Sequence, residues 1–173
     1  MDIGSMQRQQ GAVLIISLII LVLLTSLGVS VMQSAIVEQK MANNQRDTNT
    51  AMNAAEIAMH TAEIAIVNAQ NPLMRSDFDA GSNNPGLYPE TPVGSDEPWE
   101  LLATWSGNGS VVVDVSNGLY AKPPRYIIQR IGEFERGPSM TDKQVVRIVR
   151  ITAIGYGTSE NSRVMLQADY RWN

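Results

Sequence analysis

The spacing of polar residues that comes nearest to a chemical site is D-x-D-x-G-x-N, at residues 77–83. Oxygen ligands at alternate positions are typical of calcium loops. The glutamate that completes an EF-hand twelve residues into its loop is absent, because Tyr88 occupies that place. An ordinary polar surface loop would have the same residues at these positions. We favour the surface loop and predict no cofactor, with Asp77, Asp79 and Asn83 as the calcium candidate.

Residue types that support catalysis are scarce. His60 is the one histidine, it lies in an alanine-rich helical stretch, and a structural role at the edge of a packing face explains it. The chain has no cysteine, no phosphate-binding loop and no Ser-His-Asp set. A net charge of −4 gives no basic surface for nucleic acid. We therefore predict a protein that is neither an enzyme nor a nucleic-acid binder.

A long apolar segment near the amino terminus dominates the chain. No charged residue occurs from Ala12 to Val37, and 14 of the 20 residues from Ala12 to Val31 are Leu, Ile or Val. Twenty helical residues cover about 30 Å, the thickness of the hydrocarbon core of a bilayer. The segment is predicted to span a membrane, with residues 12–34 as the transmembrane part.

The residues before this segment form a short polar leader, 1–11. Gly11 stands directly before Ala12, and a glycine leaves the following peptide bond open to a protease. A secretory signal peptide fits less well, because the apolar run is long and no A-x-A site follows it. Arg8 indicates that the leader side is cytoplasmic, with the bulk of the chain in the periplasm or outside. Met6 offers a second start within the leader.

Beyond the membrane the helix is predicted to continue as an amphipathic half, residues 35–70. Neither proline nor glycine occurs from Gln33 to Gln70. The sequence AEIA occurs twice, seven residues apart, which aligns equivalent side chains along one helix. The alanines would let another backbone come close. We expect this half to pack on a sheet or other helices through Met52, Ile57, Met59, Ile64 and Ile66, with Ile57 and Ile64 buried.

The remainder, residues 71–173, is predicted to be a globular β domain. Residues 71–109 are rich in Pro, Gly, Asn, Ser and Asp and indicate a long irregular surface loop, free for partner contacts. Strands are expected at 110–115, 125–135, 144–157 and 163–172, and a turn at 158–162 makes a hairpin of the last two. Both faces of 144–157 are partly apolar, which is typical of a central strand. The fold class is α+β, one long helix on an antiparallel sheet.

Together these segments resemble type IV pilins: a leader ending in glycine, a directly following apolar run, an extended helix and a small β domain. The stretch QQGAVLIISLIILVLLTSLGVSVMQSAIVEQKMANNQRD, the segment NAAEIAMHTAE and the end RITAIGYGTSENSRVMLQADYRW are similar to PilX-type minor pilins. The resemblance implies cleavage between Gly11 and Ala12 by prepilin peptidase, then methylation of the new amino terminus. It also implies insertion in the inner membrane, and then assembly into a pilus at the cell surface.

Three departures from the common pilin pattern bear on the role. The fifth residue after the leader is Ile16, where most pilins carry a glutamate thought to meet the amino terminus of a neighbouring subunit. The carboxy-terminal cysteine pair of major pilins is missing, and Ala12 stands where Phe or Met is more usual. The resemblance therefore implies a minor pilin that initiates assembly and sits at or near the tip. Its implied partners are other minor pilins, the major pilin and a large tip adhesin.

Two other readings stay open at the level of sequence. A minor pseudopilin of a type II secretion system would share the leader, helix and β domain. A single-pass membrane protein with a periplasmic binding domain would share the anchor, and differs through Gly11 and the unbroken helix.

Overall fold

A computed structural model describes residues 4–68, 75–78, 84–115, 118–139 and 142–172, with side chains at 12–68, 77–78, 84–115, 118–135 and 145–171. The elements are α1 (Gly4–Asn68), β1 (Leu87–Tyr88), β2 (Val111–Val112), β3 (Arg125–Ser139), β4 (Asp142–Tyr156) and β5 (Arg163–Trp172). Two 3₁₀ turns, η1 (Arg75–Phe78) and η2 (Leu102–Trp105), lie between them. The chain divides into two compact units, Met1–Gln45 and Arg46–Asn173.

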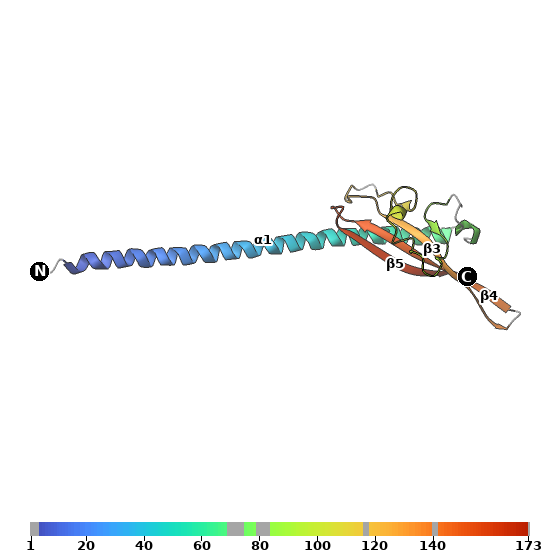
Figure 1. Cartoon of the computed structure of the whole chain (residues 1–173), viewed down its shortest axis with the longest axis horizontal. Coiled ribbons are helices and arrows are strands. Elements are labelled where there is room, and N and C mark those ends of the chain that lie inside the picture. Colours follow the sequence, from blue (N-terminus) through green and yellow to red (C-terminus); the bar gives the residue numbers. More distant parts are fainter. Residues whose placement is uncertain (1–3, 69–74, 79–83, 116–117, 140–141, 173) are drawn as a thin grey trace. The chain divides into compact units, whose positions relative to one another are not determined.

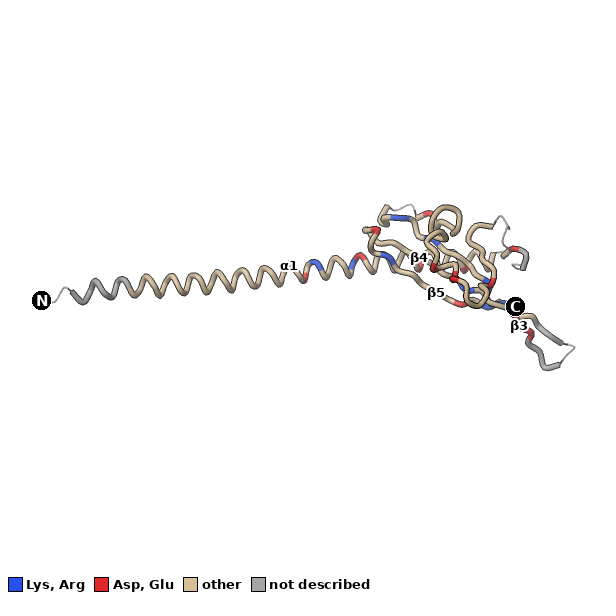
Figure 2. The backbone as a smooth tube through the Cα atoms, in the orientation of Figure 1, with Lys and Arg blue, Asp and Glu red and all other residues tan. Residues whose placement is uncertain are grey.

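The described residues of the first unit, 4–45, are all helical residues of α1. Every described side chain from Ala12 to Gln45 is exposed, including the whole apolar run. Figure 2 shows no Lys, Arg, Asp or Glu on the described part of this segment before Glu38. Hydroxyls within the run donate back to the helix backbone, as Ser17 does to the Leu14 carbonyl at 2.8 Å, so they add little polar surface. By length and composition, α1 can cross a membrane.

In the second unit, the carboxy-terminal part of α1 lies beside the sheet (Figure 1). Small residues at helical spacing form its buried face. These are Ala51, Ala54, Ala55, Ala58 and Ala62, each with no exposed surface, followed by Ile66. Because alanine is a strong helix former with a one-carbon side chain, this face keeps the helix regular and allows close approach to the strands. The helix ends at Asn68, shortly before Pro72.

The sheet has the order β1–β3–β4–β5, with β2 also paired to β3. The pairs β3–β4 and β4–β5 are antiparallel, and Gly157–Ser162 connects β4 to β5 as the sequence predicted. The prediction of a purely antiparallel sheet was wrong in one place. β1 runs parallel to β3, with Leu87 opposite Ile128, so the sheet is mixed. A two-residue strand within a polar loop has no periodicity that could reveal it.

Both faces of β4 are covered. On one face Val149, Ile151 and Ala153 join the helix residues Ala58, Ala62 and Ile66 in the main core, with Tyr126 and Ile128 of β3. On the other face, Thr152 is buried and Gln129 of β3 is almost completely buried. The Gln129 amide nitrogen donates to Thr91 Oγ1 at 2.7 Å and to Glu97 Oε2 at 2.8 Å. These bonds attach the segment before η2 to the sheet.

The long loop is therefore less free than the sequence suggested. Within 71–109, Phe78 is part of the core, Thr104 is buried, and Leu87–Tyr88 forms β1. The Tyr88 hydroxyl also donates to the Gly109 carbonyl at 2.8 Å. Phe78, Thr104 and β1 therefore attach described parts of this loop to the rest of the domain, while residues 92–96 are exposed.

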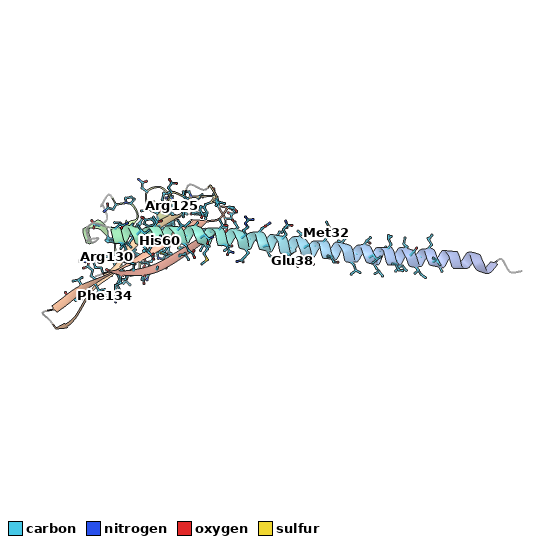
Figure 3. The ribbon with its side chains drawn as sticks, turned by 180° about the vertical axis from the view of Figure 1, so that it is seen from behind. Met32, Glu38, His60, Arg125, Arg130 and Phe134 are labelled. Carbon is cyan, nitrogen blue, oxygen red and sulfur yellow. The ribbon has the colours of Figure 1, made fainter. Side chains whose placement is uncertain are left out.

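The β3–β4 hairpin continues beyond the part of β4 that pairs with β5. Pairing with β5 begins at Arg147, whereas β4 begins at Asp142. The register with β4 shifts between Arg130 and Gly132, which is a β-bulge. Figure 3 labels Phe134 on this extension, where the side chain is exposed.

Candidate functional site

The predicted processing and assembly residues lie in the first unit. Gly11 is a helical residue of α1, and the side chains of Ala12 and Ile16 are exposed. Ile16 is one of many exposed apolar side chains in this part of the helix, and side chains project from the helix on all sides (Figure 3). In the described part of α1 the first acidic residue is Glu38, so no carboxylate lies near position 16. Such a surface suits lipid or the apolar helices of other subunits.

The five predicted helix-packing residues separate into two groups. Ile66 is buried, and Met59 packs against the core from its edge. Met52, Ile57 and Ile64 are exposed instead, Ile57 by 36% and Ile64 by 45%. The expectation that Ile57 and Ile64 are buried was wrong. The sheet selects the alanine face of the helix because only small side chains permit the close contact described next.

The contact between α1 and β4 is a contact of backbones. A Cβ added to Gly155 would overlap the Ala55 nitrogen and the Ala51 carbonyl oxygen, and would lie 2.8 Å from the Ala54 carbonyl carbon. No side chain fits between the two elements at this point. Gly155 and the alanines of α1 are therefore complementary, and together they fix the position of the helix on the strand.

A polar contact lies three residues after Gly155, at the turn that follows β4. The Thr158 amide and hydroxyl both donate to Asp47 Oδ1, each at 2.6 Å. Gly157 leaves room for this, since a Cβ there would overlap the Asp47 carboxylate. The Thr158 hydroxyl is the main cause that lowers the pKa of Asp47 below its ordinary value of 3.8. We call the Asp47–Thr158 contact the clasp.

Sequence reasoning missed both Gly155 and the clasp. One signal was available for Gly155: a glycine inside a strand pattern often marks close approach of another backbone. The clasp joins residues 111 positions apart, and nothing in the local sequence of Asp47 or Thr158 indicates it.

Comparison with known families gives two matches. The model described as "Type IV pilus assembly protein PilX C-term" matches residues 38–172, and "PilX N-terminal" matches residues 10–59. The first match covers well over half of the chain. The chain belongs to the PilX family of type IV pilus assembly proteins. No curated protein and no solved structure matches it.

Membership of the PilX family identifies a minor pilin of type IV pilus assembly, a component that interacts with other pilus proteins. The family is structural rather than catalytic, which agrees with the prediction made from residue types. The long helix on a small β domain is the pilin-like α+β layout expected from the sequence.

The remaining candidates for chemistry are not brought together by the described structure. Asp77 lies in η1, whereas Asp79 and Asn83 lie outside the described residues. Among the residues that are described, no group of three His, Asp or Glu side chains could hold a metal ion. His60 is exposed on α1 (Figure 3), where no acid–base partner is within hydrogen-bond reach among the described contacts.

Proposed function

We propose that this PilX-family chain helps to initiate a type IV pilus and remains at or near the tip of the fibre. In this role it belongs to a complex of minor pilins, in contact with the major pilin and a large tip adhesin. It has no enzymatic activity of its own. Prepilin peptidase removes residues 1–11, and the amino-terminal methyl group follows on Ala12.

Ile16 is the observation that carries this proposal. A glutamate in an apolar fibre core is costly unless it pairs with a positive group, such as the amino terminus of the next subunit. Ile16 offers no such pair, and the nearest described acid along α1 is Glu38. A subunit without this carboxylate suits the end of a fibre, where one neighbour is missing, better than its interior.

The charges of the leader support an orientation of the chain in the membrane. The leader carries Arg8 and the α-amine, which favours its retention on the cytoplasmic side. The β domain then lies in the periplasm before assembly and at the cell surface afterwards. A chain without cysteine is compatible with an oxidising compartment, where an unpaired thiol would be a liability.

Subunit counting tests the proposal. Pili are purified, and peptides of this chain and of the major subunit are measured by quantitative mass spectrometry against isotope-labelled standards. We expect few copies of this chain per fibre. An abundance equal to that of the major subunit would make it a bulk component and contradict the tip assignment.

A further inference from the structure

A groove lies on the face of the sheet that points away from α1. Ile154 and Tyr156 of β4 alternate with residues that contact the helix, so their side chains project from the opposite face. Between this face and the segment 99–106, which includes η2, there are two hollows of about 420 Å³ each. Leu102 and Trp105 line both of them. We call the two hollows together the Trp105 groove.

The lining of the groove is mainly apolar and aromatic. Trp99 and Met165 complete the first hollow, and Pro123 completes the second beside the Tyr156 ring. Pockets of several hundred Å³ with such a lining are the usual form of a binding site. The Leu102 side chain, shared by both hollows, is 79% exposed. A ligand that fills both hollows would remove this apolar surface from water, which favours binding.

Three cationic side chains border the groove. Arg163 of β5 lines the first hollow, and Lys122 and Arg125 line the second. Glu100 is the one acid among the described residues of both linings. The groove is therefore locally positive, although the whole chain carries a net charge of −4.

Little of this positive charge is neutralised within the chain. Arg163 is exposed and forms no ion pair with any residue that the structure describes. The Arg125 guanidinium donates to two neutral oxygens, a backbone carbonyl at 2.9 Å and a serine hydroxyl at 3.2 Å. Lys122 pairs with Glu160 at 2.8 Å, but both side chains are exposed, and breaking such a pair costs little. Charge complementarity therefore favours an acidic ligand.

The polar atoms of the groove are largely engaged within the chain, which bears on the kind of ligand. The Trp105 indole N–H donates to the Trp99 carbonyl at 2.9 Å, and the Ser106 hydroxyl donates to the Ala103 carbonyl at 3.1 Å. A saccharide would bring many hydroxyl groups, and each needs a new partner when water leaves. A proline-rich peptide brings apolar rings instead, and its prolines have no N–H to satisfy.

We propose that the Trp105 groove binds an extended, proline-rich and acidic segment of another protein. Its prolines fill the two hollows and cover Leu102, and its carboxylates meet Arg163 in one hollow and Lys122 and Arg125 in the other. Aromatic grooves bind polyproline II segments in this way, because the free segment is already extended and loses little entropy on binding. The inference does not depend on where the chain lies in the fibre.

Fluorescence anisotropy with synthetic peptides tests the inference. The full chain in phosphatidylcholine nanodiscs is titrated into a fluorescein-labelled peptide of four Glu-Pro-Pro repeats, and we expect saturable binding. A Lys-Pro-Pro peptide of the same length keeps the conformation but reverses the charge, and a Glu-Gly-Ser peptide keeps the charge but lacks proline. Each should bind about tenfold more weakly, because one loses the ion pairs and the other the apolar contacts.

Matched variants of exposed residues locate the binding site. Leu102→Ser should weaken binding of the Glu-Pro-Pro peptide about tenfold, since it removes the apolar side chain shared by both hollows. Val93→Ser changes an exposed aliphatic residue outside both hollows and should have no effect. Arg163→Glu should weaken binding roughly fivefold. Arg171→Glu makes the same change of charge at the other end of β5 and should have no effect.

Several outcomes would overturn the inference. These are no saturable binding up to about 1 mM peptide, equal binding of the Glu-Pro-Pro and Lys-Pro-Pro peptides, or equal affinities of a variant and its matched control. Trigalacturonic acid is titrated as a competitor. If this acidic saccharide binds more tightly than the peptide, and Leu102→Ser abolishes its binding, the groove is a saccharide site and the peptide assignment is wrong.

Discussion

Gly155 of β4 and Ala55 of α1 touch through their backbones, with no space for a side chain at the glycine. The contact joins the end of β4, an inner strand of the sheet, to the alanine face of the helix. It also explains why the exposed isoleucines of α1 lie on the opposite side, because a branched side chain on the inner face would hold the helix away from the strand.

Gly155→Ala should destabilise the folded chain by roughly 1–3 kcal/mol, because the added methyl group meets helix backbone that cannot rotate away. The measurement is urea unfolding of the full chain in detergent. Gly132→Ala is the control, since a Cβ at that position meets only the Phe134 ring at 3.4 Å. Equal stabilities of the two variants would contradict the close contact.

Ile66→Ala should lower the free energy of unfolding by about 2–5 kcal/mol, because it leaves a cavity in the main core. Ile64→Ala makes the same chemical change on the exposed side of the same helix and should cost far less in the isolated chain. Thermal melts of the two variants measure and compare their losses of stability. A larger loss for Ile64→Ala would mean that the assignment of the two faces is reversed.

The clasp should open in acid. The pKa of Asp47 is lowered in the folded chain, so its contribution to stability is present above 3.8, the ordinary value, and is lost as the pH falls through the lowered folded pKa. The hydrogen-exchange protection factor of the Thr158 amide should therefore fall below pH 3.8.

Asp47→Asn isolates this effect from other carboxylates. Its side-chain oxygen still accepts a hydrogen bond but no longer titrates, so protection at Thr158 should be weaker and independent of pH in that range. If protection in the unmodified chain shows no greater pH dependence than in Asp47→Asn, the carboxylate is not what holds the turn.

Gly11→Val should leave an unprocessed precursor in the membrane, because the branched side chain blocks access to the peptide bond before Ala12. The mass of the amino-terminal peptide reports the cleavage. Gly28→Val is the matched control in the same helix, at a site with nothing within 4 Å, and should be processed normally. Normal cleavage of Gly11→Val would remove the main sequence support for processing at this position.

Ile16→Glu should increase the number of copies of this chain per fibre, because a carboxylate at this position can pair with the amino terminus of a neighbour. Unpaired, the same group costs a few kcal/mol in an apolar environment. Ile16→Gln is similar in size and uncharged, and should not increase the count. Quantitative mass spectrometry of purified pili measures the copy number of both variants. An unchanged copy number for Ile16→Glu would mean that residue 16 does not determine the position of the chain in the fibre.

The sequence alone determined the features that rest on local patterns. An apolar run without charges predicts a membrane helix because each buried charge would be costly. The absence of helix breakers up to Gln70 predicted the end of α1 to within two residues, although the helix begins at Gly4, within the predicted leader. The β-branched residues predicted β3, β4 and β5, with β5 at its observed limits. The turn at 158–162 followed from its position after Gly157.

Only the tertiary structure decided which face of α1 is buried. By hydrophobicity, Ile57 and Ile64 are the better core residues, yet the core takes Ala58 and Ala62. The reason is that burial depends on how closely two backbones approach, and at Gly155 the strand approaches the helix with no room for a side chain. The bond from Thr158 to Asp47 and the parallel pairing of β1 have the same origin, since both join residues that are distant in sequence and adjacent only after the sheet has formed.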